Sequence, residues 1–237
     1  MNADQARQLT LGVRLREGHD FENFVTGRNS AAVAALHGLL DGFALPLVYL
    51  WGESGTGKTH LLEALCARGS ERGMQIAYVP LAKRESLDPE MLVGLDSASL
   101  VCVDDVHAVA GDLRWEEALF HLYNQLDSGV APMVIAALRA PLKCGWRLKD
   151  LESRLASGAT YEISPLNDDE RATVLRHRAR ARGFEFPDDA IRYILRREER
   201  SMHTLMSILD CLDTESLTHQ RKVSIPLVKD VLSRLRD

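Results

Sequence analysis

The sequence predicts an α/β fold in which a mostly parallel five-stranded sheet is followed by a small all-α domain. Two observations carry this prediction. Five short apolar segments alternate with helical segments in the first part of the chain, which is typical of a parallel sheet covered by helices. Beyond Pro165 the apolar residues recur only at helical spacing. We therefore expect a flexible N-terminal segment over residues 1–20, an α/β domain over 21–165 and a helical domain over 166–237.

The strands are expected where apolar runs lie between turn-forming residues. The first run, LPLVYLW at 45–51, contains Pro46 near its start and is followed by Gly52. A strand that is buried on both faces has this apolar composition. The other four strands are expected at residues 75–81, 99–103, 133–138 and 159–163.

Helical periodicity fills the intervals between these strands. The sequence predicts helices over residues 30–40, with Ser30 as a possible N-cap, from Lys58 onward, and over 115–126. In the C-terminal part, Asn167 and Glu170 have the spacing of a capping box. An apolar stripe at 202–212 and a last helix after Ser224, with Pro226 in its first turn, complete the helical domain.

The overall charge argues against a protein that binds DNA mainly through its own basic residues. The formal net charge is −5 and the sequence pI is about 5.9, whereas nucleic-acid-binding domains are often strongly basic. Five arginines lie between 171 and 182 on one predicted helix. We interpret them as a solvated helical face.

The four cysteines have no metal-site spacing and are interpreted as small hydrophobic residues. No N-terminal apolar stretch resembles a signal peptide, and no run is long enough to predict a membrane span. The sequence therefore predicts a cytoplasmic protein without a membrane partner.

The strongest chemical signal is a complete phosphate-binding motif between the first strand and the next helix. The pattern G-x-x-x-x-G-K-T uses glycines to wrap the backbone N–H groups around a phosphate, at a helix N-terminus whose dipole favours anions. The lysine reaches the β- and γ-phosphates, and the threonine hydroxyl binds Mg²⁺. The motif consists of Gly52, Glu53, Ser54, Gly55, Thr56, Gly57, Lys58 and Thr59.

A second signal lies at the end of the strand at 99–103. Asp104 and Asp105 follow this apolar run directly. In P-loop enzymes an acid in this place holds Mg²⁺, and a neighbouring acid polarises the attacking water. We therefore expect Thr59 and Asp104 to bind Mg²⁺ and Asp105 to act in catalysis.

These motifs, with others, give the chain a resemblance to the bacterial replication initiators of the DnaA family, which are AAA+ proteins. The segment Phe21-Glu22-Asn23-Phe24-Val25, followed by Gly27 and Asn29, resembles their adenine-side segment. The segment Val103-Asp104-Asp105-Val106-His107 resembles their Walker B segment, and Leu151-Glu152-Ser153-Arg154-Leu155 with Gly158 resembles their arginine-finger segment. The resemblance implies an AAA+ P-loop fold with a helical lid, and ADP or ATP with Mg²⁺ as cofactors. It places Phe24 and Val25 beside the nucleotide.

Within this family, a stand-alone AAA+ module most resembles the Hda-type regulatory inactivators of DnaA. The resemblance implies that Arg154 is an arginine finger that enters the nucleotide site of a neighbouring subunit, and that Arg200 is the lid arginine that contacts nucleotide. It further implies that the chain lacks the DNA-binding domain with which the initiator continues. The strand at 133–138 departs from the family, because Ala136, Ala137 and Leu138 stand where relatives have a polar sensor 1 residue.

The N-terminus resembles the peptide by which such regulators bind the sliding clamp. It reads Gln8-Leu9-Thr10-Leu11-Gly12-Val13. One amide and three apolar side chains suit a hydrophobic groove, so the resemblance assigns clamp binding to Gln8, Leu9, Leu11 and Val13. Gly12 replaces a residue that is often proline, which leaves the peptide less preorganised.

The predicted function is negative regulation of replication initiation. With the DNA-loaded clamp, the protein is expected to stimulate ATP hydrolysis on DnaA through Arg154, while its own ATPase is weak. Its expected partners are DnaA, the clamp and, through the AAA+ interface, other copies of itself, with DNA contacted mainly through the clamp. Two alternatives stay open: an autonomous AAA+ ATPase such as a helicase loader, and a non-catalytic adaptor that tethers DnaA-like partners.

Overall fold

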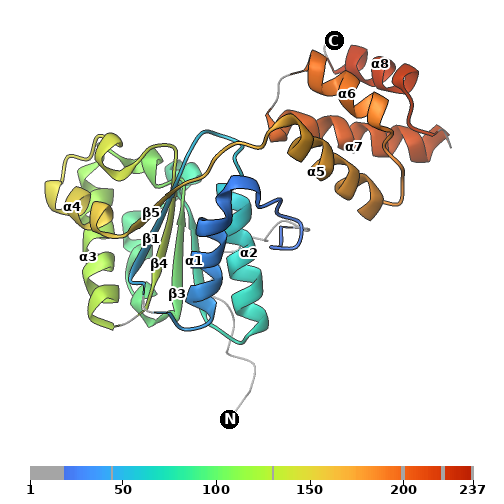
Figure 1. Cartoon of the computed structure of the whole chain (residues 1–237). Helices are drawn as coiled ribbons and strands as arrows, with labels where there is room; N and C mark the ends of the chain where they lie inside the picture. The colour runs from blue at the N-terminus through green and yellow to red at the C-terminus, as the bar shows by residue number, and fades with distance from the viewer. Residues whose placement is uncertain (1–18, 44, 130, 199–200, 220–221, 236–237) are drawn as a thin grey trace. The chain divides into compact units, whose positions relative to one another are not determined.

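The computed structural model describes residues 19–235 except 44, 130, 199–200 and 220–221. The chain divides into two compact units, and the second contains residues 54–56 and the chain from Pro165 onward. Both units are drawn in Figure 1. Among the described residues, no helix is both long and apolar enough to span a membrane.

The first unit contains a five-stranded sheet in which every strand pairing is parallel. The strand order is β2-β3-β4-β1-β5, so the chain crosses over between strands through helices and 3₁₀ turns. The central strand β1 pairs with β4 on one side and β5 on the other. The strands are β1 (Leu47–Trp51), β2 (Ile76–Pro80), β3 (Leu100–Asp104), β4 (Met133–Ala137) and β5 (Ala159–Glu162).

Helices cover both faces of this sheet. Figure 1 shows α1 (Ser30–Leu40) and α2 (Lys58–Glu71) on one face, and α3 (Leu113–Gly129) and α4 (Lys149–Ser157) on the other. Because successive strand residues point to opposite faces, β1 contributes to two cores. Val48 and Leu50 pack with α1 and α2. Leu47 and Tyr49 pack with α3 and α4.

Six 3₁₀ segments connect the larger elements of the first unit. Three of them lie between β2 and β3, a stretch for which the periodicity predicted no element. They are η1 (Gly27–Asn29), η2 (Leu81–Ser86), η3 (Pro89–Leu92), η4 (Leu95–Ser97), η5 (Val106–Val109) and η6 (Pro141–Lys143).

The predicted α/β fold with its all-α addition is confirmed, whereas one detail at the start of α1 is wrong. Ser30 is the first residue of α1, and the N-cap position belongs to Asn29, whose side chain makes no capping bond. Asn29 instead exchanges two hydrogen bonds with the backbone of Ser164, at 2.8 and 3.2 Å. This buried amide fastens the start of α1 to the chain just after β5.

The described part of the second unit contains four helices. The predicted capping box is present, because Asn167 and Glu170 each bond the other's backbone N–H at the start of α5. A single apolar core joins the four helices, with Leu175, Ile191, Leu209 and Val228 almost fully buried. The helices are α5 (Asp168–Ala181), α6 (Asp188–Arg197), α7 (Met202–His219) and α8 (Ile225–Arg234).

Candidate nucleotide-binding site

The P-loop connects the carboxyl end of β1 to the N-terminus of α2. Gly55 and Gly57 have φ values of +76° and +97°, a conformation that other residues rarely adopt. A Cβ atom on Gly57 would lie 2.8 Å from Cε2 of Phe24. Phe24, from the segment that precedes α1, therefore packs directly against the loop backbone. Glycine at 57 is required both by the turn and by this close approach.

Lys58, the first residue of α2, is only 6% exposed. Its ammonium group donates to the carbonyl oxygens of Gly52, at 2.9 Å, and Glu53, at 2.7 Å. Burial lowers the pKa of Lys58, and the charges of Asp105 and Asp104 offset part of this effect. A desolvated cation at a helix N-terminus is suited to an anionic ligand. The local chemistry thus fits a nucleotide phosphate.

Asp104 ends β3 and is 2% exposed. It accepts hydrogen bonds from the Tyr78 hydroxyl at 2.9 Å and from the Asp105 amide at 3.0 Å. The Thr59 side chain bonds to it as well. Burial, and secondarily the neighbouring Asp105 charge, raise the pKa of Asp104, although these hydrogen bonds work in the opposite direction. Two carboxylates and a hydroxyl are the hard oxygen donors that Mg²⁺ prefers, so the residues fit a magnesium site.

Asp104→Asn is expected to stabilise the ligand-free protein at neutral pH while removing Mg²⁺ binding. A carboxyl whose folded-state pKa is raised destabilises the fold when it is ionised, and this cost disappears as the pH falls through that pKa. The stability difference between variant and wild type should therefore be largest near neutral pH and shrink in acid. Urea unfolding across this pH range measures it, with the exposed Asp96→Asn as control. A difference that grows in acid would contradict the assignment.

Asp105 has a positive φ, +54°. Among the described residues, every other residue with a positive φ is glycine. Asp105 leads into η5, which carries His107. The Leu138 amide, just after β4, donates to Nδ1 of His107 at 3.3 Å. Burial lowers the pKa of His107. Because Nδ1 accepts from the Leu138 amide, the ring carries its proton on Nε2. Sequence reasoning left His107 without a role, yet it contacts the position that lacks a polar sensor 1 side chain. A histidine two residues after a Walker B acid was the available signal.

Arg154 lies on the exposed face of α4, whereas Leu151 and Leu155 anchor the helix in the core. Its guanidinium lies over the Tyr123 ring of α3, 5.8 Å from the ring centroid. A planar guanidinium stacked on an aromatic face keeps its N–H donors available at the edge. The structure thus places this side chain at the surface on a rigid helix.

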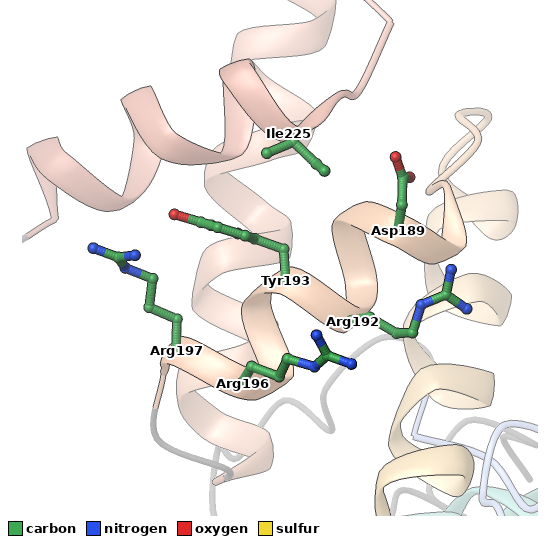
Figure 2. A pocket seen from close by; sticks show the side chains of 6 residues that line it. All are labelled: Asp189, Arg192, Tyr193, Arg196, Arg197 and Ile225. Atoms are coloured by element: carbon green, nitrogen blue, oxygen red, sulfur yellow. The ribbon is translucent and has the colours of Figure 1, made fainter.

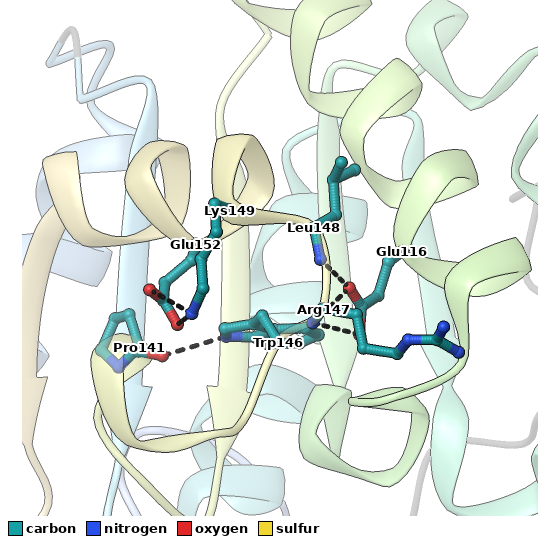
Figure 3. Close-up of polar contacts among 7 residues, drawn as sticks. All are labelled: Glu116, Pro141, Trp146, Arg147, Leu148, Lys149 and Glu152. Atoms are coloured by element: carbon teal, nitrogen blue, oxygen red, sulfur yellow. Dashed lines mark hydrogen bonds and ion pairs between the residues drawn. The ribbon is translucent and has the colours of Figure 1, made fainter.

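Glu116 of α3 is fully buried and holds the chain that leads into α4 (Figure 3). Its carboxylate accepts the backbone N–H groups of Arg147 at 2.9 Å and Leu148 at 2.7 Å. It also accepts the N–H of Gly111 at 2.7 Å, in the loop that follows η5. Leu148 is the N-cap residue of α4 and makes no side-chain cap, so Glu116 satisfies the donors at this helix start from another element. One carboxylate therefore fixes both the Walker B loop and the Arg154 helix.

Glu116→Gln is expected to destabilise the protein by about 1–3 kcal/mol, the usual cost of leaving a buried donor unsatisfied. One oxygen becomes an NH₂ group, which cannot accept from the backbone amides. The neighbouring Glu117→Gln is the matched control, because Glu117 is exposed. Chemical denaturation measures both variants, and equal stabilities would contradict the role given to this carboxylate.

Two predicted sites lie outside the described residues. They are the lid arginine Arg200 and the clamp-binding peptide with Gln8, Leu9, Leu11 and Val13. Of the adenine-side pair, Phe24 contacts the P-loop as described, and Val25 follows it with a half-buried side chain. No group of three or more potential metal ligands among His, Cys, Asp and Glu occurs within the described residues.

Comparison with known proteins gives matches over both units. Residues 15–163 match the family model of the bacterial DnaA ATPase domain, and residues 168–232 match that of the Hda lid domain. Domain III of DnaA from Thermotoga maritima has a similar structure, with a TM-score of 0.80 and 22% identity, over 94% of this chain and 98% of that one.

Two further solved structures show the same fold. AMPPCP-bound DnaA from Aquifex aeolicus has a TM-score of 0.74 and 22% identity, over 95% of this chain and 72% of that one. The RuvB Holliday junction branch migration motor from Thermotoga maritima has a TM-score of 0.71 and 17% identity, over 92% of this chain and 72% of that one. The predicted AAA+ architecture with a helical lid is confirmed.

Proposed function

Since the chain belongs to the family of the bacterial DnaA ATPase domain and carries an Hda-type lid, we propose that it is a regulator of replication initiation. It acts on ATP-bound DnaA and promotes hydrolysis of the ATP that DnaA holds. The nucleotide consumed belongs to the partner, and the regulator supplies Arg154 in trans. ADP or ATP with Mg²⁺ in its own P-loop serves to maintain the fold.

The placement of Arg154 carries this proposal. Its backbone is held by two buried leucines and, at the start of the helix, by Glu116, while its guanidinium is exposed beside Tyr123. Among the described residues Arg154 makes no ion pair, so its charge is available to a partner. An arginine that stabilises charge on a transferring phosphoryl group needs this combination of rigid support and open donors.

Intrinsic ATP hydrolysis is expected to be slow. The Walker acids are in place, but Ala137 and Leu138 present no side chain that orients water, and the His107 Nδ1 atom is occupied by the Leu138 amide. Steady-state phosphate release by the purified protein measures the intrinsic rate of hydrolysis. The Asp105→Asn variant gives the background rate to subtract. Turnover in the usual range of about 1–10³ s⁻¹ would favour the autonomous ATPase instead.

The N-terminal peptide is proposed to bring the regulator to the clamp. The test is hydrolysis of labelled ATP on DnaA, with and without DNA-loaded clamp, in the presence of the wild-type regulator or its Gln8→Ala/Leu11→Ala variant. We expect the clamp to enhance stimulation by the wild type only. If the variant responds to the clamp as the wild type does, the peptide has been assigned wrongly. If the wild type never stimulates hydrolysis, the regulator proposal fails.

A specific observation favours the autonomous ATPase as the second candidate. Thr59, Asp104 and Asp105 together retain the groups of a hydrolytic site. Turnover in isolation separates the two enzymatic proposals. An adaptor that only tethers DnaA would need none of these groups, and it would bind DnaA without changing the rate of hydrolysis.

A further inference from the structure

A group of basic side chains on the helical unit is not used by the proposed function. Three arginines of α6 and a lysine of α8 surround Tyr193, and we call this group the α6–α8 basic patch. The three arginines and Lys229 are exposed. The three arginines border an open pocket of about 440 Å³, shown in Figure 2. Its lining residues are Asp189, Arg192, Tyr193, Arg196, Arg197 and Ile225.

The arginines of this patch differ from those of the neighbouring helix α5. Ion pairs in the α5 segment join Arg171 to Asp168, Arg176 to Asp188 and Arg182 to Asp210. The sequence drew attention to five arginines between residues 171 and 182, and carboxylates of the same unit pair with these three. By contrast, none of the four cations of the patch forms an ion pair within the part of the chain that the structure describes. A local positive potential therefore remains on a chain whose net charge is −5.

Tyr193 holds two of these cations together. The Arg197 guanidinium and the Lys229 ammonium each lie 5.7 Å from the centroid of its ring. The ring quadrupole attracts cations, so it offsets part of the repulsion between like charges from two different helices. In Figure 2 the guanidinium groups of Arg192 and Arg196 extend to the same side of α6, and Arg197 extends to the other. Arg192 and Arg196 thus form a short row along one side of α6.

We propose that the α6–α8 basic patch binds the phosphate backbone of nucleic acid. Guanidinium groups bind phosphate oxygens in a bidentate manner. Arg192 and Arg196 are about 6 Å apart along the helix axis, from the rise of about 1.5 Å per residue, so they meet different phosphates of one strand. Asp189 repels anions and sets one end of the contact.

A protein partner fits this surface less well. Arginine and tyrosine are common in protein interfaces, but the centre of an interface is apolar and carries few charges, whereas three arginines and Asp189 line this pocket around Ile225 and Tyr193. A nucleic-acid backbone requires no such centre, because release of counterions supplies most of the affinity. With about four contacts, binding should be weak and strongly salt-dependent, which agrees with a contact made beside the clamp rather than with an independent DNA-binding protein.

The experiment measures the fluorescence anisotropy of two labelled DNA probes, a single strand of about 20 nucleotides and a duplex of about 20 base pairs. Each probe is titrated with the full-length protein at about 50–200 mM salt. The test variant is Arg192→Gln/Arg196→Gln. The control, Lys143→Gln/Arg180→Gln, removes the same charge at two exposed positions elsewhere. We expect the test variant to bind about tenfold more weakly at low salt. The slope of the logarithm of the binding constant against the logarithm of the salt concentration should become shallower by about 1.8 for the duplex and about 1.4 for the single strand. The control should bind as the wild type does.

Three results would overturn the proposal. The wild type does not bind either probe at low salt, or both variants lose the same affinity, or a poly-glutamate peptide displaces the probe as effectively as unlabelled DNA. The last result would assign the patch to an acidic protein segment. Far-ultraviolet circular dichroism and unfolding of both variants confirm that they fold. No DnaA or clamp is present in this experiment, so its outcome is independent of the proposed regulation.

Discussion

Arg154→Ala should reduce the stimulation of ATP hydrolysis on DnaA by about 10³-fold or more, the range observed for arginine fingers supplied in trans. The side chain is exposed and lies over the Tyr123 ring, so its removal leaves the core of α4 intact. Binding of nucleotide by the regulator itself and its thermal stability should change little. A turnover assay with radiolabelled ATP on DnaA, in the presence of DNA-loaded clamp, measures the effect.

Two further variants make this result specific. Arg154→Lys keeps the charge but loses the planar fork that binds two phosphate oxygens, so it should restore little activity. Lys149→Ala removes a cation from the same helix, one that is 74% exposed and pairs only with Glu152 within the described residues, and it should stimulate as the wild type does. Stimulation by Arg154→Ala at the wild-type rate would refute the finger and favour the adaptor.

Lys58→Ala is the second variant from which a large effect is expected. Hydrogen bonds to a charged group contribute about 1.5–3 kcal/mol, so the dissociation constants of ADP and ATP should rise about 10–150-fold. At a ligand concentration of about 100 times the wild-type constant, bound nucleotide stabilises the fold by about 2.7 kcal/mol. The variant should lose about half of this increment or more.

Thermal unfolding with and without ADP and Mg²⁺ measures that increment. Lys83→Ala, at an exposed position in η2, should keep it in full. An equal nucleotide-dependent stabilisation in Lys58→Ala and wild type would mean that the ligand binds elsewhere. Because the wild-type ammonium is buried with a lowered pKa, the ligand-free variant should be no less stable than the ligand-free wild type.

The elements that are buried on both faces could be predicted from sequence, because burial imposes apolar runs that alternate with helices. β1 illustrates this: its predicted and observed ends differ only at the start, where Pro46 lacks the amide that would extend the ladder, although its carbonyl accepts from Met133. The P-loop was equally predictable, since its glycines and Lys58 are local in sequence.

The contacts that position the candidate site were not predictable in the same way. Glu116 and Leu148 lie 32 residues apart, and nothing in the periodicity of α3 distinguishes a buried glutamate from an exposed one. The pairing of Asn29 with Ser164 spans 135 residues. The link between His107 and Leu138 likewise depends on β3 and β4 being neighbours in the sheet. Such contacts follow from the strand order, which local patterns do not determine.

The bonds of Glu116 also have a consequence for how this sequence can change. Within the part of the chain that the structure describes, its hydrogen-bond donors belong to the main chain of Gly111, Arg147 and Leu148, and substitution of those residues leaves their N–H groups in place. A side-chain pair can exchange its members by compensating mutations, whereas a carboxylate that serves backbone amides has no side chain to exchange with. Selection for suppressors of Glu116→Gln should therefore return reversion to glutamate rather than changes at these three positions.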